Sequence, residues 1–262
     1  MPQIKTLKTL AYNLWLGIYL PYKLVRSYMP AIVAHRGASA LAPENTLESF
    51  ELAIFLGADM LEFDVHRTLD NVLVVCHEHD IDGADVACIP YTLLSDLPSG
   101  AFVPTLESVL KLASGRIRLD VELKEAGYEA EILGLLQRYF EPSEYVVTSS
   151  LDGAILRVKE LDPRIRTGLI IGAQPYSFKE LFPVWRLLGD QADFLVCKNL
   201  MSSQFLLLQS VLLDLPLYIY TVNDQTSMQW LSKFRQVEGI VTNMPMAWSP
   251  HATGRISPRP SR

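Results

Sequence analysis

The sequence predicts a (β/α)8 barrel, an α/β fold in which eight parallel strands alternate with helices. Three observations favour this fold class. The chain has 262 residues, and such barrels often run to about 250 residues as a single domain. From Ala31 onward, short runs rich in β-branched and aromatic residues alternate with patterns of helical period. No linker long enough to divide residues 31–250 into two domains interrupts this alternation.

Nine segments have the composition of strands: residues 31–35, 60–65, 72–77, 117–122, 145–149, 167–171, 193–197, 217–222 and 239–242. Parallel neighbours need a crossover of about a dozen residues or more. Only six residues separate Val65 from Val72, so we expect these two segments to form a short antiparallel hairpin at the C-terminal mouth of the barrel. With Asp70 and Asn71 as turn residues, Asp64 would face His77. Eight barrel strands then remain.

The first crossover helix follows residues 31–35. Asn45 and Glu48 have the spacing of a capping box at its start, and Gly57 suits its C-terminal end. Apolar residues at helical spacing are expected to form its buried face: Leu47, Phe50 and Ile54.

The composition excludes several classes of protein. Hydrophobic residues make up 49% of the chain and charged residues 20%, which argues against a disordered or collagen-like chain. The three cysteines are too few and too scattered for a disulfide framework or a zinc site, and we interpret them as buried thiols in a reducing, cytoplasmic compartment: Cys76, Cys88 and Cys197. The formal net charge is −6 without a long run of Lys or Arg, which argues against nucleic-acid binding.

Residues 1–30 differ in charge from the acidic chain as a whole, because they carry four basic residues and no acidic one. Their apolar residues lie on one helical face, but the apolar stretch 10–20 is shorter than the roughly 20 residues that span a bilayer. Two interpretations stay open: a basic amphipathic helix that makes peripheral membrane contact, or a helix that closes the bottom of the domain or packs on another chain. Residues 251–262, rich in Pro, Ser and Arg, are expected to form a flexible tail.

Charged residues alternate with apolar ones on two of the expected strands. Strands of a parallel barrel are buried on both faces, so such charges are costly, and catalytic groups collect at the C-terminal ends of barrel strands. We therefore predict a site for one hard divalent cation, Mg²⁺ or Ca²⁺, with three carboxylate ligands: Glu62, Asp64 and Glu122. Arg118 and Asp120 lie deeper in their strand and are expected to make internal ion pairs.

Histidines and basic residues are expected at the same mouth. His35 ends the first strand and His77 ends the return arm of the hairpin; histidine can act as acid or base near neutral pH. Arg36 and Lys124 offer fixed positive charge that suits phosphate oxygens. Two other histidines are interpreted as solvated loop residues: His66 and His79.

Residues 34–82 resemble the glycerophosphodiester phosphodiesterase family, whose pattern reads HRG, PENT, E-x-D-V, T-x-D-G and V-V-x-H-D. Further matches follow in the same order, to about residue 245: VPTLESVL (103–110), VELK (121–124), YTVND (220–224) and GIVTNMP (239–245). The resemblance implies a TIM barrel that binds one divalent cation and cleaves glycerophosphodiesters to glycerol 3-phosphate and an alcohol.

The resemblance also implies a role for each matching residue: acid–base catalysis for His35 and His77, metal binding for Glu62, Asp64 and Glu122, phosphate contact for Arg36 and Lys124, and support of the rim for Glu44. Asn223, in the YTVND match, is a weaker candidate for the rim.

This sequence also departs from the family pattern. Glu78 replaces the usual Asp after the second histidine and could still orient His77. The insertion that normally covers the site must be small, because only about forty residues separate His77 from Ile117. Residues that differ from the pattern lie around the expected substrate pocket or its rim: Ser150, Tyr220 and Asn243.

Three functions stay open. The first is hydrolysis of water-soluble glycerophosphodiesters such as glycerophosphocholine. The second is a lysophospholipase D that acts on lysophospholipids at a membrane surface, which the basic N-terminal segment favours. The third is a catalytically inactive barrel that binds phosphodiesters or a protein partner, although the complete set of charged residues argues against it. The roles of the two histidines and the oligomeric state also stay open.

Overall fold

The computed structural model describes residues 29–172, 187, 189, 191–198 and 203–247. The helix expected within residues 1–30 falls almost wholly outside this part of the chain, and the tail expected at 251–262 falls outside it completely.

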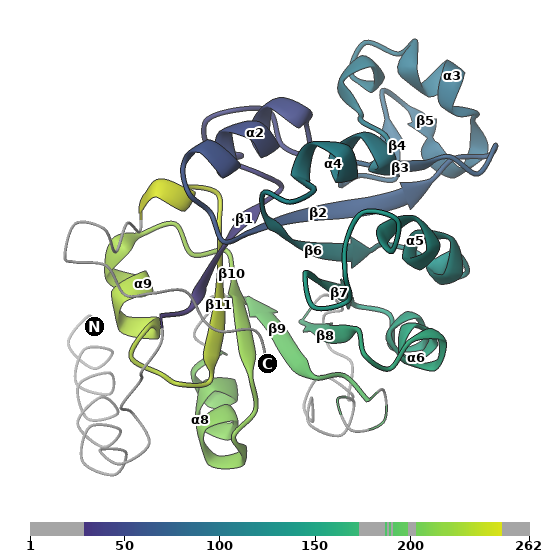
Figure 1. Ribbon diagram of the computed structural model, residues 1–262. Coiled ribbons are helices and arrows are strands. Elements are labelled where there is room, and N and C mark those ends of the chain that lie inside the picture. Colours follow the sequence, from purple (N-terminus) through teal and green to yellow (C-terminus); the bar gives the residue numbers. More distant parts are fainter. Residues whose placement is uncertain (1–28, 173–186, 188, 190, 199–202, 248–262) are drawn as a thin grey trace, which may run out of the picture.

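Eight parallel strands of the described chain close into a barrel with helices on its outside (Figure 1). The strands are β1 (Ala31–His35), β2 (Met60–Arg67), β6 (Arg118–Leu123), β7 (Tyr145–Ser149), β8 (Arg166–Ile171), β9 (Phe194–Lys198), β10 (Leu217–Tyr220) and β11 (Val237–Thr242). β1 pairs with both β2 and β11, which closes the sheet. The predicted fold class is confirmed, and each predicted strand agrees with an observed one to within two residues at either end.

Helices connect the strands along the outer face of the barrel: α2 (Leu47–Phe55), α4 (Leu106–Ala113), α5 (Glu129–Leu136), α6 (Asp152–Leu161), α8 (Ser203–Leu213) and α9 (Gln225–Leu231). Two large apolar clusters fill the space between these helices and the sheet. A third cluster fills the barrel interior: Val33, Met60, Val146, Ile170, Phe194, Val196, Tyr218 and Val241. Apolar packing therefore occupies this part of the interior, and the polar side chains described below lie beyond it.

The first crossover helix begins one residue later than predicted. Thr46 is its N-cap and forms the capping box with Ser49, whereas the prediction used Asn45 and Glu48. Asn45 instead adopts a left-handed backbone conformation (φ 56°) and donates its side-chain amide to Asp64 at 2.9 Å. Gly57 follows the helix with φ 79°, as expected. Of the predicted apolar face only Phe50 is fully buried; Ile54 is half-buried and Leu47 is exposed.

The predicted hairpin forms between β2 and β3 (Leu73–Val75), but its register is shifted by one residue. Val65 lies opposite Val75, so Asp64 faces Cys76, whose N–H donates to the Asp64 carbonyl at 3.1 Å. The reason is a longer turn. Three residues, with Asn71 in the left-handed region (φ 63°), connect Thr68 to Val72, where two were expected. His77 therefore lies beyond the strand pair and does not face Asp64 across it.

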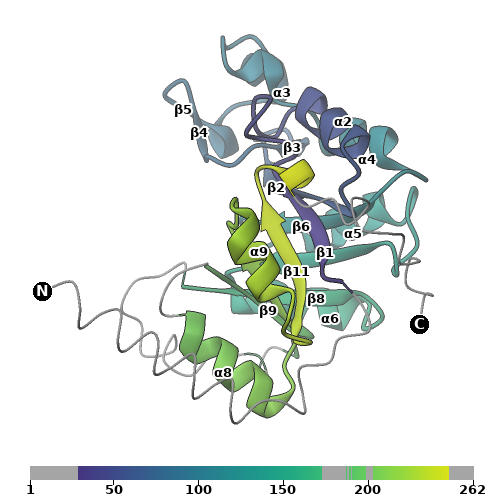
Figure 2. The ribbon, with the colours of Figure 1, turned by 90° about the vertical axis from the view of Figure 1, so that its left-hand side faces the viewer.

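The segment between β3 and α4 is the small excursion that the sequence predicted. It contains short elements only: β4 (Asp80–Ile81), β5 (Ala84–Asp85), η1 (Val86–Cys88), α3 (Tyr91–Ser95) and η2 (Gly100–Phe102). Both views place it far from α8 (Figures 1 and 2). It also holds the one cysteine that departs from the prediction, since Cys88 is exposed, whereas Cys76 and Cys197 are buried.

The turn after β1 depends on Gly37. Its backbone is left-handed (φ 82°), and an added Cβ would lie 2.7 Å from the backbone carbonyl carbon of Ser49. We expect Gly37→Ala to lower the free energy of unfolding by about 3 kcal/mol, because backbone strain and a steric clash add. Chemical denaturation of the variant measures this loss.

Gly115→Ala is the matched control, because Gly115 is also left-handed (φ 69°) but has no atom within 4 Å of the added Cβ. Backbone strain alone should cost it about 1 kcal/mol. Equal losses in the two variants would show that the close approach of Gly37 to Ser49 contributes nothing.

Candidate active site

The predicted site residues gather inside the mouth of the barrel, where β1, β2 and β6 end. Met60 belongs to the interior cluster, so alternation along β2 turns Glu62 and Asp64 to the same inner face. The strand register places Asp64 beside Glu122 of β6 and Glu62 beside His35 of β1. Adjacent strands therefore bring together the carboxylates and one of the histidines.

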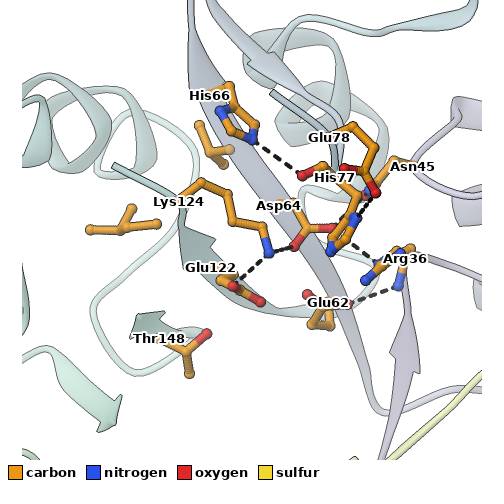
Figure 3. A network of polar contacts seen from close by, with 12 residues as sticks. Arg36, Asn45, Glu62, Asp64, His66, His77, Glu78, Glu122, Lys124 and Thr148 are labelled. Atoms are coloured by element: carbon orange, nitrogen blue, oxygen red, sulfur yellow. Dashed lines mark hydrogen bonds and ion pairs between the residues drawn. The ribbon is translucent and has the colours of Figure 1, made fainter. Parts of the chain in front are cut away.

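Three carboxylates form the centre of this group (Figure 3). Oxygen atoms of Glu62, Asp64 and Glu122 all lie within 4.8 Å of one another, and Glu62 and Asp64 are buried. Burial and the neighbouring carboxylates raise the pKa of Glu62 well above its ordinary value, and the same two causes raise the pKa of Glu122 to about 7. This mutual repulsion and the all-oxygen donor set fit a hard divalent cation, which would stabilise the ionised carboxylates.

Two basic side chains neighbour the carboxylates. The ammonium nitrogen of Lys124 lies 2.7 Å from Glu122 and 2.8 Å from Asp64. Arg36 donates its backbone N–H to Glu62 at 2.8 Å, and its Nε lies 3.2 Å from Asp64. Burial alone would raise the pKa of Asp64, but Lys124 and Arg36 together lower it. Arg36 also donates from Nη1 to Glu44 at 2.9 Å, so Glu44 lies at the rim as expected.

His35 is held by residues that follow β11 and β10. Its Nδ1 lies 2.7 Å from the side-chain oxygen of Asn243, and the backbone N–H of Asn243 donates to the side-chain oxygen of Asn223 at 2.9 Å. An amide oxygen accepts only, so Nδ1 carries the proton and Nε2 is left as the basic atom. Burial and the neighbouring Arg36 lower the pKa of His35. Within the described part of the chain, Asn223, the weaker candidate from the sequence, is linked to this histidine through Asn243.

His77 lies just beyond β3, beside the carboxylates (Figure 3). Its Nδ1 is hydrogen-bonded to the carboxylate of Glu78 at 2.8 Å, so the longer acidic residue reaches the histidine that it follows. The imidazole is half-buried and Glu78 is exposed. Every predicted site residue therefore lies at this end of the barrel, whereas the catalytic and binding roles assigned to them stay predictions.

Two expectations about nearby residues are wrong. His66 was expected in a solvated loop, but it lies within β2 and is only 4% exposed. Arg118 and Asp120 were each expected to make internal ion pairs; in the described chain Asp120 accepts a hydrogen bond from the hydroxyl of Thr148 at 2.8 Å, and Arg118 is exposed. Burial raises the pKa of Asp120 to about 7. His79 is exposed, as expected.

The sequence analysis did not predict that Asn45 donates a hydrogen bond to Asp64, nor that His66 is buried. The alternation along β2 already carried the signal for His66, because it shares the parity of Glu62 and Asp64. Nothing in the local sequence distinguishes Asn45, whose contact depends on its left-handed backbone conformation.

Comparison with known proteins identifies the family. Residues 35–247 match the model of the Glycerophosphoryl diester phosphodiesterase family. The chain belongs to this family. The Bacillus subtilis protein YhdW is 32% identical over 82% of this chain and 94% of its own length. The glycerophosphodiester phosphodiesterase of the same organism is 26% identical over 81% of this chain and 83% of its own length.

Solved structures of glycerophosphodiester phosphodiesterases have the same fold. One from Parabacteroides distasonis superposes with a TM-score of 0.70 at 27% identity, covering 82% of this chain and 93% of its own. A phosphodiesterase of Oleispira antarctica, solved in complex with sn-glycerol-3-phosphate, superposes with a TM-score of 0.70 at 24% identity, covering 84% and 95%. The family resemblance seen in the sequence is thereby confirmed. Among the described residues, no helix is both long and apolar enough to cross a membrane.

Proposed function

We propose that this member of the glycerophosphodiester phosphodiesterase family hydrolyses glycerophosphodiesters to glycerol 3-phosphate and an alcohol, with one divalent cation and a pair of histidines. One observation carries the proposal: three carboxylates within 4.8 Å of one another share the barrel mouth with two basic side chains and two histidines. The product complex of the Oleispira antarctica phosphodiesterase supports glycerol 3-phosphate as the product.

The cation would be held by Glu62, Asp64 and Glu122. Carboxylate oxygens suit both Mg²⁺ and Ca²⁺, and we propose that either ion can fill the site. When bound, a divalent cation supplies electrostatic stabilisation of the negative charge that develops on phosphate oxygens.

Arg36 and Lys124 would bind the non-bridging oxygens of the phosphodiester. Both are already fixed beside the carboxylates, and a guanidinium and an ammonium remain charged at neutral pH. Arg36 donates from Nη1 to Glu44, and its Nε lies 3.2 Å from Asp64, so two carboxylates hold the guanidinium beside the site before substrate arrives. Such preorganised charge stabilises a transition state with little reorganisation.

The two histidines would transfer protons on opposite sides of phosphorus. Nε2 of His35, left basic by the bond from Nδ1 to Asn243, takes the proton of the attacking water. The P–O bond to the alcohol breaks, and His77 donates a proton to the departing alkoxide while the Glu78 carboxylate stays hydrogen-bonded to its Nδ1. Family chemistry also allows the glycerol 2-hydroxyl as nucleophile, with a cyclic phosphate that water then opens.

Lysophospholipase D activity is the second candidate. It is favoured by two exposed apolar residues, Leu41 and Met246, which lie on the segments that follow β1 and β11. The N–H of Ala40 donates to the carbonyl of Asn243, so these segments adjoin next to His35. An acyl chain could contact this part of the rim.

The test is an assay of the purified protein on glycerophosphocholine, glycerophosphoglycerol and lysophosphatidylcholine, each with Mg²⁺, Ca²⁺ or a chelator. We expect glycerol 3-phosphate from the first two substrates with a divalent cation and none with the chelator. Release of choline and lysophosphatidate from lysophosphatidylcholine would favour the second candidate. If no product forms from any substrate with either cation, both proposed activities are contradicted, and a catalytically inactive, phosphodiester-binding barrel is the remaining alternative.

A further inference from the structure

His66 is a buried histidine to which neither the sequence nor the proposed mechanism gives a role. It lies two residues after Asp64 on β2. Its Nδ1 is 2.6 Å from a carboxylate oxygen of Glu125. Its Nε2 is 3.3 Å from the backbone carbonyl oxygen of His77 (Figure 3). Both ring nitrogens of this buried imidazole therefore face hydrogen-bond acceptors, and an N–H at Nε2 donates to the carbonyl of His77.

Glu125 is itself anchored to β2. It follows Lys124 directly, and its backbone N–H donates to the hydroxyl of Tyr128 at 3.0 Å. That hydroxyl donates in turn to the carbonyl of Val65 at 2.8 Å, and Tyr128 is only 1% exposed. The loop after β6 is therefore fixed at the residue that precedes His66, which holds Glu125 where it meets the imidazole.

His77 lies beyond the strand ladder that would otherwise fix it. β3 ends at Val75, and in the described chain the hydrogen bonds between β2 and β3 reach Cys76. The next residue along is His77, whose carbonyl accepts from the ring of His66. The hydrogen bond from the His66 side chain on β2 therefore holds the chain one residue beyond the last backbone hydrogen bond between β2 and the segment that follows β3.

We propose that His66 and Glu125 position His77 for proton transfer to the leaving group. The proposal rests on the acid role given to His77 in the proposed function. The position of the His77 backbone matters because a proton donor acts within a narrow range of distance from the leaving group. A displacement of about 1 Å can lower the rate by about a hundredfold. His66 and Glu125 are positioning residues: they reach the substrate only through His77.

The variants His66→Leu and His66→Gln differ in whether a side chain at position 66 can still donate a hydrogen bond to the carbonyl of His77. Leucine removes both hydrogen bonds, whereas glutamine keeps an N–H that can donate to the carbonyl of His77. On glycerophosphocholine we expect His66→Leu to lower kcat by about tenfold to a hundredfold with little change in KM, and His66→Gln to recover most of that loss. Glu125→Ala should lower kcat by a smaller factor, because the bond from His66 to His77 remains.

A substrate whose leaving group needs no proton distinguishes positioning from a general loss of structure. With the p-nitrophenyl diester of glycerol 3-phosphate, we expect the kcat of His66→Leu to stay within about threefold of the wild-type value. His77→Ala should show the same selectivity between the two substrates. His79→Leu, at an exposed histidine of the neighbouring excursion, is the matched control and should leave both rates unchanged.

The outcomes keep the two proposals apart. Equal loss on both substrates in His66→Leu, with selective loss in His77→Ala, would overturn the positioning role and leave the acid role of His77 intact. Full activity of His66→Leu on both substrates would also overturn the positioning role. If the wild-type protein hydrolyses neither substrate, or if His77→Ala loses both rates equally, the proposed function or its acid assignment fails instead. Thermal unfolding of each variant checks that the chain is folded.

Discussion

Replacement of His77 by alanine is expected to lower kcat on glycerophosphocholine by about 10²- to 10⁴-fold, the usual contribution of a positioned acid or base. The imidazole lies beside the carboxylates and is half-buried, with 31% of its side chain exposed. Its loss therefore removes a proton donor without opening a cavity in the core, and the thermal unfolding temperature should change little. Measurement of glycerol 3-phosphate release at saturating substrate gives the rate.

Glu78→Gln is the companion variant, because Glu78 is hydrogen-bonded to the same imidazole but is exposed. It should lose less activity than His77→Ala, since the amide oxygen still accepts from Nδ1. His35→Ala should be as inactive as His77→Ala, because the two act on opposite sides of one reaction. Near-normal turnover by His77→Ala would refute the acid–base pair.

The order of elements in this fold follows from local properties of the sequence, which explains why it could be predicted. Strand composition, helical period and the short distance from Val65 to Val72 are enough to give eight barrel strands and one hairpin. The two errors at turns are shifts of one residue. Asn71 and Asn45 both adopt left-handed backbone conformations. The first lies in the turn where the register between β2 and β3 is shifted by one residue, and the second precedes a helix whose N-cap lies one residue later than predicted.

The candidate site was predictable where it depends on alternation along a strand. Glu62, Asp64 and Glu122 needed only strand parity and the rule that catalytic groups gather at C-terminal ends. Partners supplied by distant elements were not predictable in this way. The bond of His35 to Asn243 requires closure of the barrel between β1 and β11, and the bond of Asp120 to Thr148 requires the register between β6 and β7.

Removal of divalent cations is expected to abolish turnover and also to change how stability depends on pH. Burial raises the pKa of Asp120 from 3.8 to about 7, and burial with the charge of Asp64 raises the pKa of Glu122 from 4.5 to about 7. Between about pH 4.5 and pH 7 the folded, cation-free chain binds more protons than the unfolded chain. Its free energy of unfolding should therefore fall as pH rises through this window, by about 1.4 kcal/mol per pH unit for each proton.

A bound cation should oppose this loss, because it stabilises the ionised carboxylates and competes with protons for them. Thermal or urea unfolding with a chelator, Mg²⁺ or Ca²⁺ should therefore show a stabilisation that is small near pH 5 and reaches about 2.7 kcal/mol near pH 7.5, when the cation is at a hundred times its dissociation constant. Glu122→Gln should show a smaller cation effect and a weaker pH dependence, whereas Glu51→Gln, at an exposed ion pair with Arg116, should behave as wild type. Identical unfolding with and without cations near pH 7.5 would mean that these three carboxylates do not hold a metal ion.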